Sequence, residues 1–217
     1  MMPKLLPPWL RELSETQQVR QEVLEAMDLP RELFVPESVS DSFRGDILTS
    51  VALPIGMGQT ISQPSTVAKM TEAVISCSPK KVLEIGTGSG FQTAVLCRLV
   101  ENVFTIERIT NIQLDSIRRL YKLGIYNFKA IAGDGYEGWP SQAPFDAIMV
   151  TAAAPAIPQK LIEQLAEGGV LVMPVGATDS PDSQQELIVA KKTESKIVTS
   201  KLGLVNFVPL VPGIQSN

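Results

Sequence analysis

The segment that most constrains this chain covers residues 81–90, KVLEIGTGSG. An apolar stretch of strand length ends in three glycines spaced two apart, Gly86, Gly88 and Gly90, and residues 91–100 carry apolar side chains at helical spacing. Glycines permit backbone angles closed to other residues and let a ligand lie against the main chain. The start of a helix adds N–H groups that have no intrahelical partner. The segment therefore predicts a strand, a tight turn and a helix, with a nucleotide site at the turn.

The spacing of the glycines narrows the choice of ligand. Phe91 stands where the dinucleotide fingerprint has its third glycine, so the match to a nicotinamide-binding turn is poor. S-adenosyl-L-methionine (AdoMet) is the better candidate. A glycine-rich turn alone is weak evidence, so two alternatives stay open at this point: a turn without a ligand and a nicotinamide-dependent oxidoreductase.

Size and charge bound the class of protein. A chain of 217 residues predicts one domain, with an N-terminal helical and loop extension over 1–52, a catalytic core over 53–212 and a frayed tail over 213–217. The net charge of −4 gives no sign of a basic surface that could neutralise phosphates, so nucleic acid is disfavoured as a partner. The proline-broken start does not read as a signal peptide, and no run reaches membrane-spanning length. We expect a cytoplasmic monomer that does not enter a membrane.

The absence of histidine removes several chemistries. A chain with no histidine cannot use a Ser-His-Asp or Cys-His catalytic group, a histidine base or a histidine-based zinc site. Cys77 and Cys97 show no metal-ligand spacing, so we expect two buried thiols and no metal.

After the glycine turn, strand and helix patterns alternate. Apolar runs of strand length fall at 103–106, 128–132, 145–150 and 170–173. Helical patterns fall at 65–75, 112–123 and 158–165, and Gly168-Gly169 is interpreted as the cap of the last one. This order predicts an α/β fold with a doubly wound, mostly parallel sheet. Three runs without intervening helices, at 187–190, 197–200 and 204–210, predict antiparallel strands at one edge.

The N-terminal part is less regular. Residues 9–28 predict one or two amphipathic helices, residues 29–36 a loop or single turn, and residues 37–50 a surface loop. Residues 53–64 contain two glycines and two prolines and fit neither helix nor strand. Because they lead into the helix before the glycine turn, we expect this irregular segment to line a site.

Ligands of an open parallel sheet bind at the carboxyl ends of its strands. Glu107 follows the second strand and could accept hydrogen bonds from both ribose hydroxyls, and Asp134-Gly135 follows the third, where an acid could approach an adenine amino group. For each residue alone a surface or turn role stays open. The small residues Thr151, Ala152 and Ala153 leave room for a second substrate, or simply pack closely. Asp146, at the opposite strand end, is interpreted as structural.

With these segments in view, the chain resembles the protein-L-isoaspartate (D-aspartate) O-methyltransferases over about residues 29–212. The Gln-Thr-Ile-Ser stretch at 59–62 is specific to that family among AdoMet enzymes, whereas the glycine turn is common to the class. The resemblance rests on separate blocks at residues 53–64, 82–96, 133–139, 143–153, 168–176 and 207–210.

The resemblance implies a class I AdoMet-dependent, Rossmann-like fold and methyl transfer to the free carboxylate of isoaspartyl residues in damaged proteins and peptides. The ester then cyclises to a succinimide. Ser62 is implied as the active-site residue, and Thr151, Ala152 and Ala153 are expected at the substrate. The residues expected to hold AdoMet are Gln59, Thr60, Ile61, Gly86, Thr87, Gly88, Gly90, Glu107, Asp134 and Gly135.

The chemistry suits a chain without histidine. A carboxylate has a pKa of about 4, so at neutral pH it is already an ionised nucleophile and needs no general base. The hydroxyl of Ser62 can donate to one carboxylate oxygen and leave the other free, although a turn or N-cap role is the alternative. The segment 37–52 is longer than the family pattern predicts. Two further hypotheses therefore stay open: a methyltransferase for another peptide carboxylate, and an AdoMet-binding module without turnover.

Overall fold

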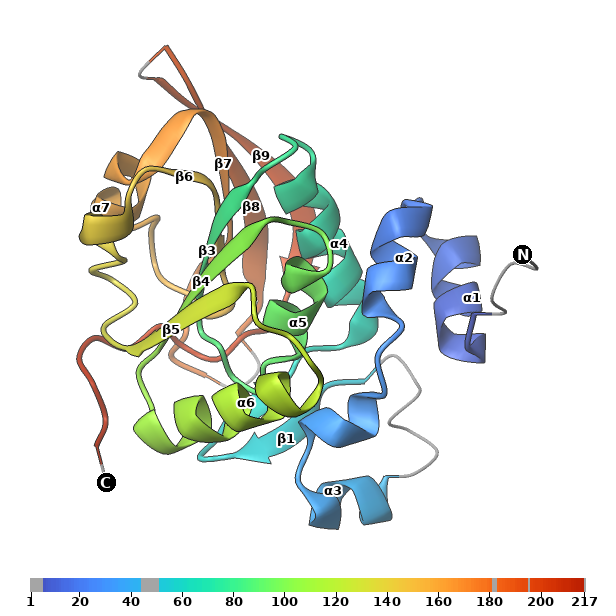
Figure 1. Cartoon of the computed structure of the whole chain (residues 1–217). Helices are drawn as coiled ribbons and strands as arrows, with labels where there is room; N and C mark the ends of the chain where they lie inside the picture. The colour runs from blue at the N-terminus through green and yellow to red at the C-terminus, as the bar shows by residue number, and fades with distance from the viewer. Residues whose placement is uncertain (1–5, 44–50, 181–182, 195, 217) are drawn as a thin grey trace.

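The computed structural model describes residues 6–43, 51–180, 183–194 and 196–216, and its centre is a seven-stranded sheet in the order β5-β4-β3-β6-β7-β8-β9 (Figure 1). The strands are β3 (Lys81–Ile85), β4 (Asn102–Glu107), β5 (Phe128–Ala132), β6 (Phe145–Val150), β7 (Leu165–Val175), β8 (Gln185–Thr193) and β9 (Lys196–Val205). The first five are parallel, and β8 and β9 pair antiparallel at one edge. The predicted fold class is confirmed.

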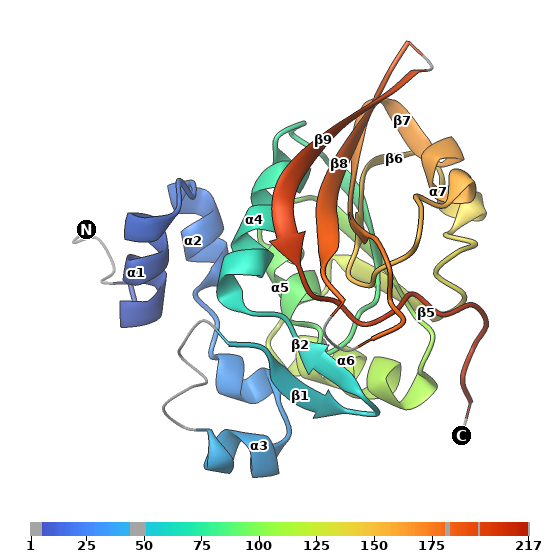
Figure 2. The same cartoon turned by 180° about the vertical axis from the view of Figure 1, so that it is seen from behind.

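Helices cover both faces of this sheet. The helices α4 (Pro64–Ile75) and α5 (Phe91–Cys97) lie on one face, and α1 (Pro8–Thr16) and α2 (Gln21–Met27) pack outside them (Figures 1 and 2). The short helix α7 (Gln159–Glu163) covers the other face, and α6 (Thr110–Lys122) packs against β4 and β5. Because the central strands are buried on both sides, they are mostly apolar runs, which is why the sequence revealed them. None of the described helices is long and apolar enough to cross a membrane.

The irregular segment before α4 is partly a hairpin. The strands β1 (Leu53–Gly56) and β2 (Gln59–Ile61) pair antiparallel, so the prediction of no strand was wrong there. Gly56, Met57 and Gly58 make the turn with φ values of 96°, 52° and 71°, a backbone region that glycine adopts without steric cost. We call residues 53–61 the active-site hairpin.

Two N-terminal predictions changed in detail. The predicted loop or turn at 29–36 contains a single 3₁₀ turn, Arg31–Phe34. The predicted surface loop begins with a short exposed helix, α3 (Glu37–Ser42), and its residues 44–50 lie outside the described part of the chain.

The C-terminal third also differs from prediction. Gly168-Gly169 does not cap a helix but lies inside β7, which begins at residue 165. The three predicted edge strands are two, because β9 continues to Val205 and residues 206–210 leave the sheet. Figure 2 shows the chain leaving β9 and running past β5 to the C-terminus. Gly213 and Gln215 are hydrogen-bonded to residues near the strand ends, so the tail is not frayed there.

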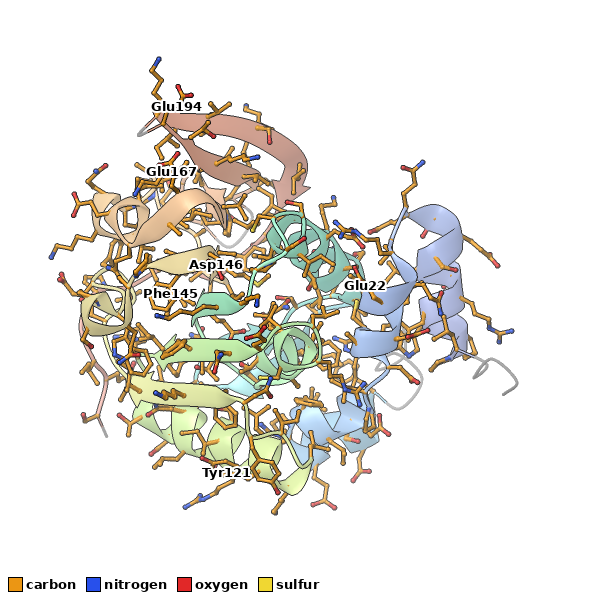
Figure 3. The ribbon with its side chains drawn as sticks, turned by 45° about the horizontal axis from the view of Figure 1, so that its top comes forward. Glu22, Tyr121, Phe145, Asp146, Glu167 and Glu194 are labelled. Atoms are coloured by element: carbon orange, nitrogen blue, oxygen red, sulfur yellow. The ribbon has the colours of Figure 1, made fainter. Side chains whose placement is uncertain are left out.

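Asp146, labelled in Figure 3, has the structural role that its position predicted. Its Oδ2 accepts the N–H groups of Lys80 and Lys81, at 2.8 and 2.9 Å. This carboxylate therefore fixes the start of β3, at the end of the sheet opposite the glycine turn.

Candidate active site

Two adjoining pockets lie at the carboxyl ends of β3, β4 and β6. The chain runs from β3 outward through β4 to β5 and returns to β6 on the other side of β3, so the strand order reverses there. The larger pocket is about 370 Å³ and the smaller about 70 Å³. They share the lining residues Thr60, Gly86, Gly88, Thr151 and Val208. The glycine turn thus opens onto both, as the sequence predicted.

The glycine turn is held closely by the end of β6. Thr151 donates from its hydroxyl to the carbonyl oxygens of Ile85 and Gly86, at 3.0 and 2.8 Å. A Cβ added to Gly86 would lie 2.3 Å from Thr151 Oγ1, and the φ of Gly86 is +93°. Only glycine fits there. Gly90 lines neither pocket, and a Cβ on it would meet Ser116 and Leu120 of α6.

The active-site hairpin supplies the wall opposite the turn. Thr60 lines both pockets, Gln59 the smaller one, and Ile61 and Ser62 the larger one. Ser62 is half-buried, and its Oγ has no hydrogen-bond partner among the described residues. The N-cap of α4 is Gln63, without a side-chain cap bond, so the alternative role of Ser62 as a cap does not hold. The Ser62 hydroxyl is therefore free to bind a ligand in the larger pocket.

Glu107 lies at the end of β4, where it lines the smaller pocket. It is 6% exposed, and its two carboxylate oxygens accept the N–H groups of Gly88 and Ile109, each at 3.0 Å. These bonds fix the carboxylate against the glycine turn. Each oxygen keeps a second lone pair, so the group can still accept hydrogen bonds from a ligand.

Like Gly90, two other predicted site residues, Asp134 and Ala153, lie outside both pockets. Asp134 uses its oxygens on the N–H groups of Tyr136 and Gly213, at 2.8 and 2.7 Å, which is the turn role left open by the sequence. Ala153 is 1% exposed and pairs through its backbone with Val208 and Leu210. Gly135 and Ala152 do line the smaller pocket, and Thr87 lines the larger one.

Sequence reasoning missed the contribution of the segment after β9. Phe207 and Val208 line the larger pocket, and residues 208–211 line the smaller one. The hydrogen bonds to Ala153 pull this segment across the strand ends. The signal that could have found it was the apolar run 207–210, which was interpreted as a strand. Arg31 was also missed, because an arginine in a loop usually lies in solvent.

A buried carboxyl group lies beneath the turn. Glu84 is fully buried in β3, and its Oε2 accepts hydrogen bonds from Thr93 and Thr105, at 2.5 and 2.7 Å. Thr105 Oγ1 lies 2.6 Å from Thr87 Oγ1, which connects the group to the larger pocket. Burial raises the pKa of Glu84 to about 8. No group of three or more His, Cys, Asp or Glu side chains within the described ranges could hold a metal ion.

Comparison with known proteins places this site in a family. The family model of protein-L-isoaspartate(D-aspartate) O-methyltransferase matches residues 9–215. The chain is 51% identical over 186 residues to the protein-L-isoaspartate O-methyltransferase of Vibrio cholerae serotype O1, covering 85% of each chain. It is 50% identical over 194 residues to that of Vibrio atlanticus, covering 89% of each.

Solved structures agree. A protein-L-isoaspartate O-methyltransferase matches with a TM-score of 0.81 and 28% identity, covering 95% of this chain, which spans 66% of that one. A Plasmodium falciparum structure, described as a putative protein-L-isoaspartate O-methyltransferase in complex with S-adenosyl-L-homocysteine, shares the fold with a TM-score of 0.78, 24% identity and coverage of 94% and 96%. The chain belongs to the protein-L-isoaspartate(D-aspartate) O-methyltransferase family.

Proposed function

We propose that this chain transfers a methyl group from AdoMet to the free carboxylate of isoaspartyl residues in damaged proteins and peptides. The observation that carries the proposal is the position of Ser62. Its hydroxyl, free of other partners among the described residues, lines the same pocket as Gly86 and Gly88. A group that can hold a carboxylate therefore shares a pocket with the turn expected to hold the cofactor. The family membership supports the same activity.

The residues at the strand ends suit AdoMet. The backbone at Gly86 and Gly88 is open to a ligand because neither residue carries a side chain, and Glu107 beside them offers acceptor lone pairs for ribose hydroxyls. Gly135 lines the smaller pocket, where its backbone would lie near the adenine of AdoMet. A Cβ there would lie 2.4 Å from Ile85 Cγ2, so only glycine fits. When bound, AdoMet supplies an electrophilic methyl group on a sulfonium ion.

The larger pocket suits the second substrate. Its described lining residues include several hydroxyl side chains, among them Thr60, Ser62, Thr66 and Thr87, and no charged side chain. An isoaspartyl carboxylate is already ionised at neutral pH, so the chain does not have to remove a proton. Its task is to hold one carboxylate oxygen and aim the other. Ser62 would donate to the first, and orientation of this kind can supply much of a rate enhancement.

The test is transfer of labelled methyl from AdoMet to an isoaspartyl peptide beside its normal-aspartyl twin. Label on the isoaspartyl peptide alone, as a base-labile ester, is the expected result. Binding of S-adenosyl-L-homocysteine without methylation of any isoaspartyl peptide would instead favour a binding module. Transfer to the normal twin at an equal rate would favour a methyltransferase for another carboxylate.

Replacing Ser62 tests its assigned role. Ser62→Ala should lower kcat/KM for the isoaspartyl peptide by about tenfold to a hundredfold, the cost of one hydrogen bond to a charged group. The dissociation constant of S-adenosyl-L-homocysteine should stay within about twofold, because the hydroxyl is assigned to the carboxylate. Ser76→Ala, at the far end of α4, is the matched control. An equal loss of rate and of cofactor affinity would contradict this role.

A further inference from the structure

Arg31 is a buried cation next to the active-site hairpin. It is 1% exposed and is the only lysine or arginine among the described residues that the fold buries so completely. Desolvation lowers its pKa to about 10, which leaves the guanidinium charged at neutral pH. Burying a charge is costly, so a fully buried arginine in the 3₁₀ turn Arg31–Phe34 indicates a specific use for the guanidinium. Two of its contacts lie at the active-site hairpin.

One guanidinium nitrogen joins the two ends of the hairpin. Arg31 Nη2 donates to the carbonyl oxygen of Val51 at 3.3 Å and to that of Ser62 at 3.0 Å. Residue 51 stands just before β1, and Ser62 stands just after β2. The hairpin itself is short, with three paired positions and an irregular register, so its own hydrogen bonds hold it weakly. The two bonds from Arg31 close its base.

The same side chain also contacts the residue that directly follows the glycine turn. The Arg31 guanidinium carbon lies 5.8 Å from the centre of the Phe91 ring, within the range of a cation–π contact. Phe91 begins α5 directly after Gly90 and lines the larger pocket. Phe34, in the same 3₁₀ turn as Arg31, packs edge-on against Phe91, with 5.1 Å between the ring centres. The N-terminal extension therefore contacts both walls of the larger pocket through one turn.

We propose that Arg31 is a positioning residue for methyl transfer, which clamps the base of the active-site hairpin and so fixes Ser62 relative to the glycine turn. This inference rests on the proposed function of Ser62. It assigns the N-terminal extension a part in the reaction, through backbone carbonyl oxygens rather than through contact with substrate. A guanidinium suits the task because it stays charged when buried and donates in a fixed plane.

The test compares Arg31→Met with Arg98→Met. Arg98 is the matched control, because its Nη1 donates to the carbonyl oxygens of Glu25, Ala26 and Asp28 and so also ties α5 to the N-terminal helices, but away from the pocket. Arg31→Met should lower kcat/KM for the isoaspartyl peptide by at least about tenfold, the effect of a misplaced catalytic group. The dissociation constant of S-adenosyl-L-homocysteine should change less than that, and Arg98→Met should change neither by more than about twofold.

Hydrogen–deuterium exchange gives a readout that does not depend on activity. Arg31→Met should speed exchange of the amides of residues 53–61, and Arg98→Met should leave them unchanged. Equal losses of peptide and cofactor affinity in Arg31→Met, activity equal to that of Arg98→Met, or unchanged exchange in the hairpin would each overturn the proposal. If the wild-type protein methylated no isoaspartyl peptide, the proposed function would fail. The exchange result would still show whether Arg31 holds the active-site hairpin in place.

Arg31→Lys keeps the test decisive if Arg31→Met does not fold. The lysine ammonium is charged but does not reach as far as the guanidinium nitrogen. We therefore expect an intermediate loss of kcat/KM and intermediate exchange in residues 53–61. Wild-type values for both in Arg31→Lys would overturn the proposal in that case.

Discussion

Replacing Glu84 with glutamine should change how the free energy of unfolding depends on pH. Glu84 lies under the glycine turn, where two threonine hydroxyls donate to its Oε2 and where its Oε1 has no partner among the described atoms. Desolvation raises the pKa of the buried carboxyl from 4.5 to about 8. The folded protein therefore holds a neutral acid at neutral pH, and the unfolded chain holds a carboxylate.

The sign of the effect follows from this difference. Because the pKa of Glu84 is higher in the folded state, the favourable contribution of the neutral acid is complete below pH 4.5 and is lost as the pH rises through about 8. A shift of this size corresponds to roughly 3 to 5 kcal/mol between the two ends of that range. Glutamine has a similar shape and is neutral at every pH, so the variant lacks this dependence.

The assay is urea unfolding of both proteins between pH 5 and pH 8.5, followed by the fluorescence of Trp9 and Trp139. The stability of the wild-type protein should fall relative to that of Glu84→Gln by a few kcal/mol across this range. Other carboxyl groups titrate alike in both proteins, so they cancel in the difference. A difference that stays constant from pH 5.5 to pH 8 would refute the raised pKa and, with it, the neutral state of the group beneath the turn.

Two further substitutions test the glycine turn and its carboxylate. Gly86→Ala should lower the free energy of unfolding by about 2 to 5 kcal/mol, because it adds a close contact with Thr151 Oγ1 to the strain of a positive φ. The control is Gly168→Ala, which has a similar φ but open space around it and should cost only about 1 to 2 kcal/mol. Equal costs in urea unfolding would show that the contact with Thr151 is harmless. Glu107→Gln should weaken S-adenosyl-L-homocysteine by about 1 to 3 kcal/mol in calorimetric titration, and an effect no larger than that of the exposed Glu101→Gln would contradict the ribose role.

The parts of the fold that the sequence predicted are those that local pattern determines. The central strands β3, β4 and β6 are buried on both faces, so each appears as a mostly apolar run whatever its partners are. The site at the glycine turn followed from the same local reasoning, because a strand, a turn and a helix are continuous in the chain. Gly86, Thr87 and Glu107 line the pockets, and their contacts with AdoMet stay predictions.

The predictions that failed depend on contacts between distant segments. Nothing in the sequence indicated that Asp134 Oδ2 accepts the N–H of Gly213, a contact across 79 residues, and the role of Asp134 at adenine stays a prediction. The active-site hairpin was missed because Pro54 and its two glycines lower strand propensity, although they suit a tight turn in a two-stranded ribbon. Gly169 was taken for a helix cap, yet it lies where a Cβ would come within 2.8 Å of the Asp146 carbonyl oxygen.

The charges of Glu84 and Arg31 suit the proposed reaction, although the two residues lie far apart in the chain. The proposed reaction joins a sulfonium cation to a carboxylate, so both formal charges disappear as the methyl group moves. A fixed charge inside the pocket would favour one separated reactant over the transition state, where these charges are already fading. The larger pocket has hydroxyl groups and no charged lining residue, Glu84 beneath it is held neutral, and the guanidinium of Arg31 acts from behind through a carbonyl oxygen. In the larger pocket, the buried guanidinium therefore positions neutral groups, and those neutral groups would meet the substrate carboxylate.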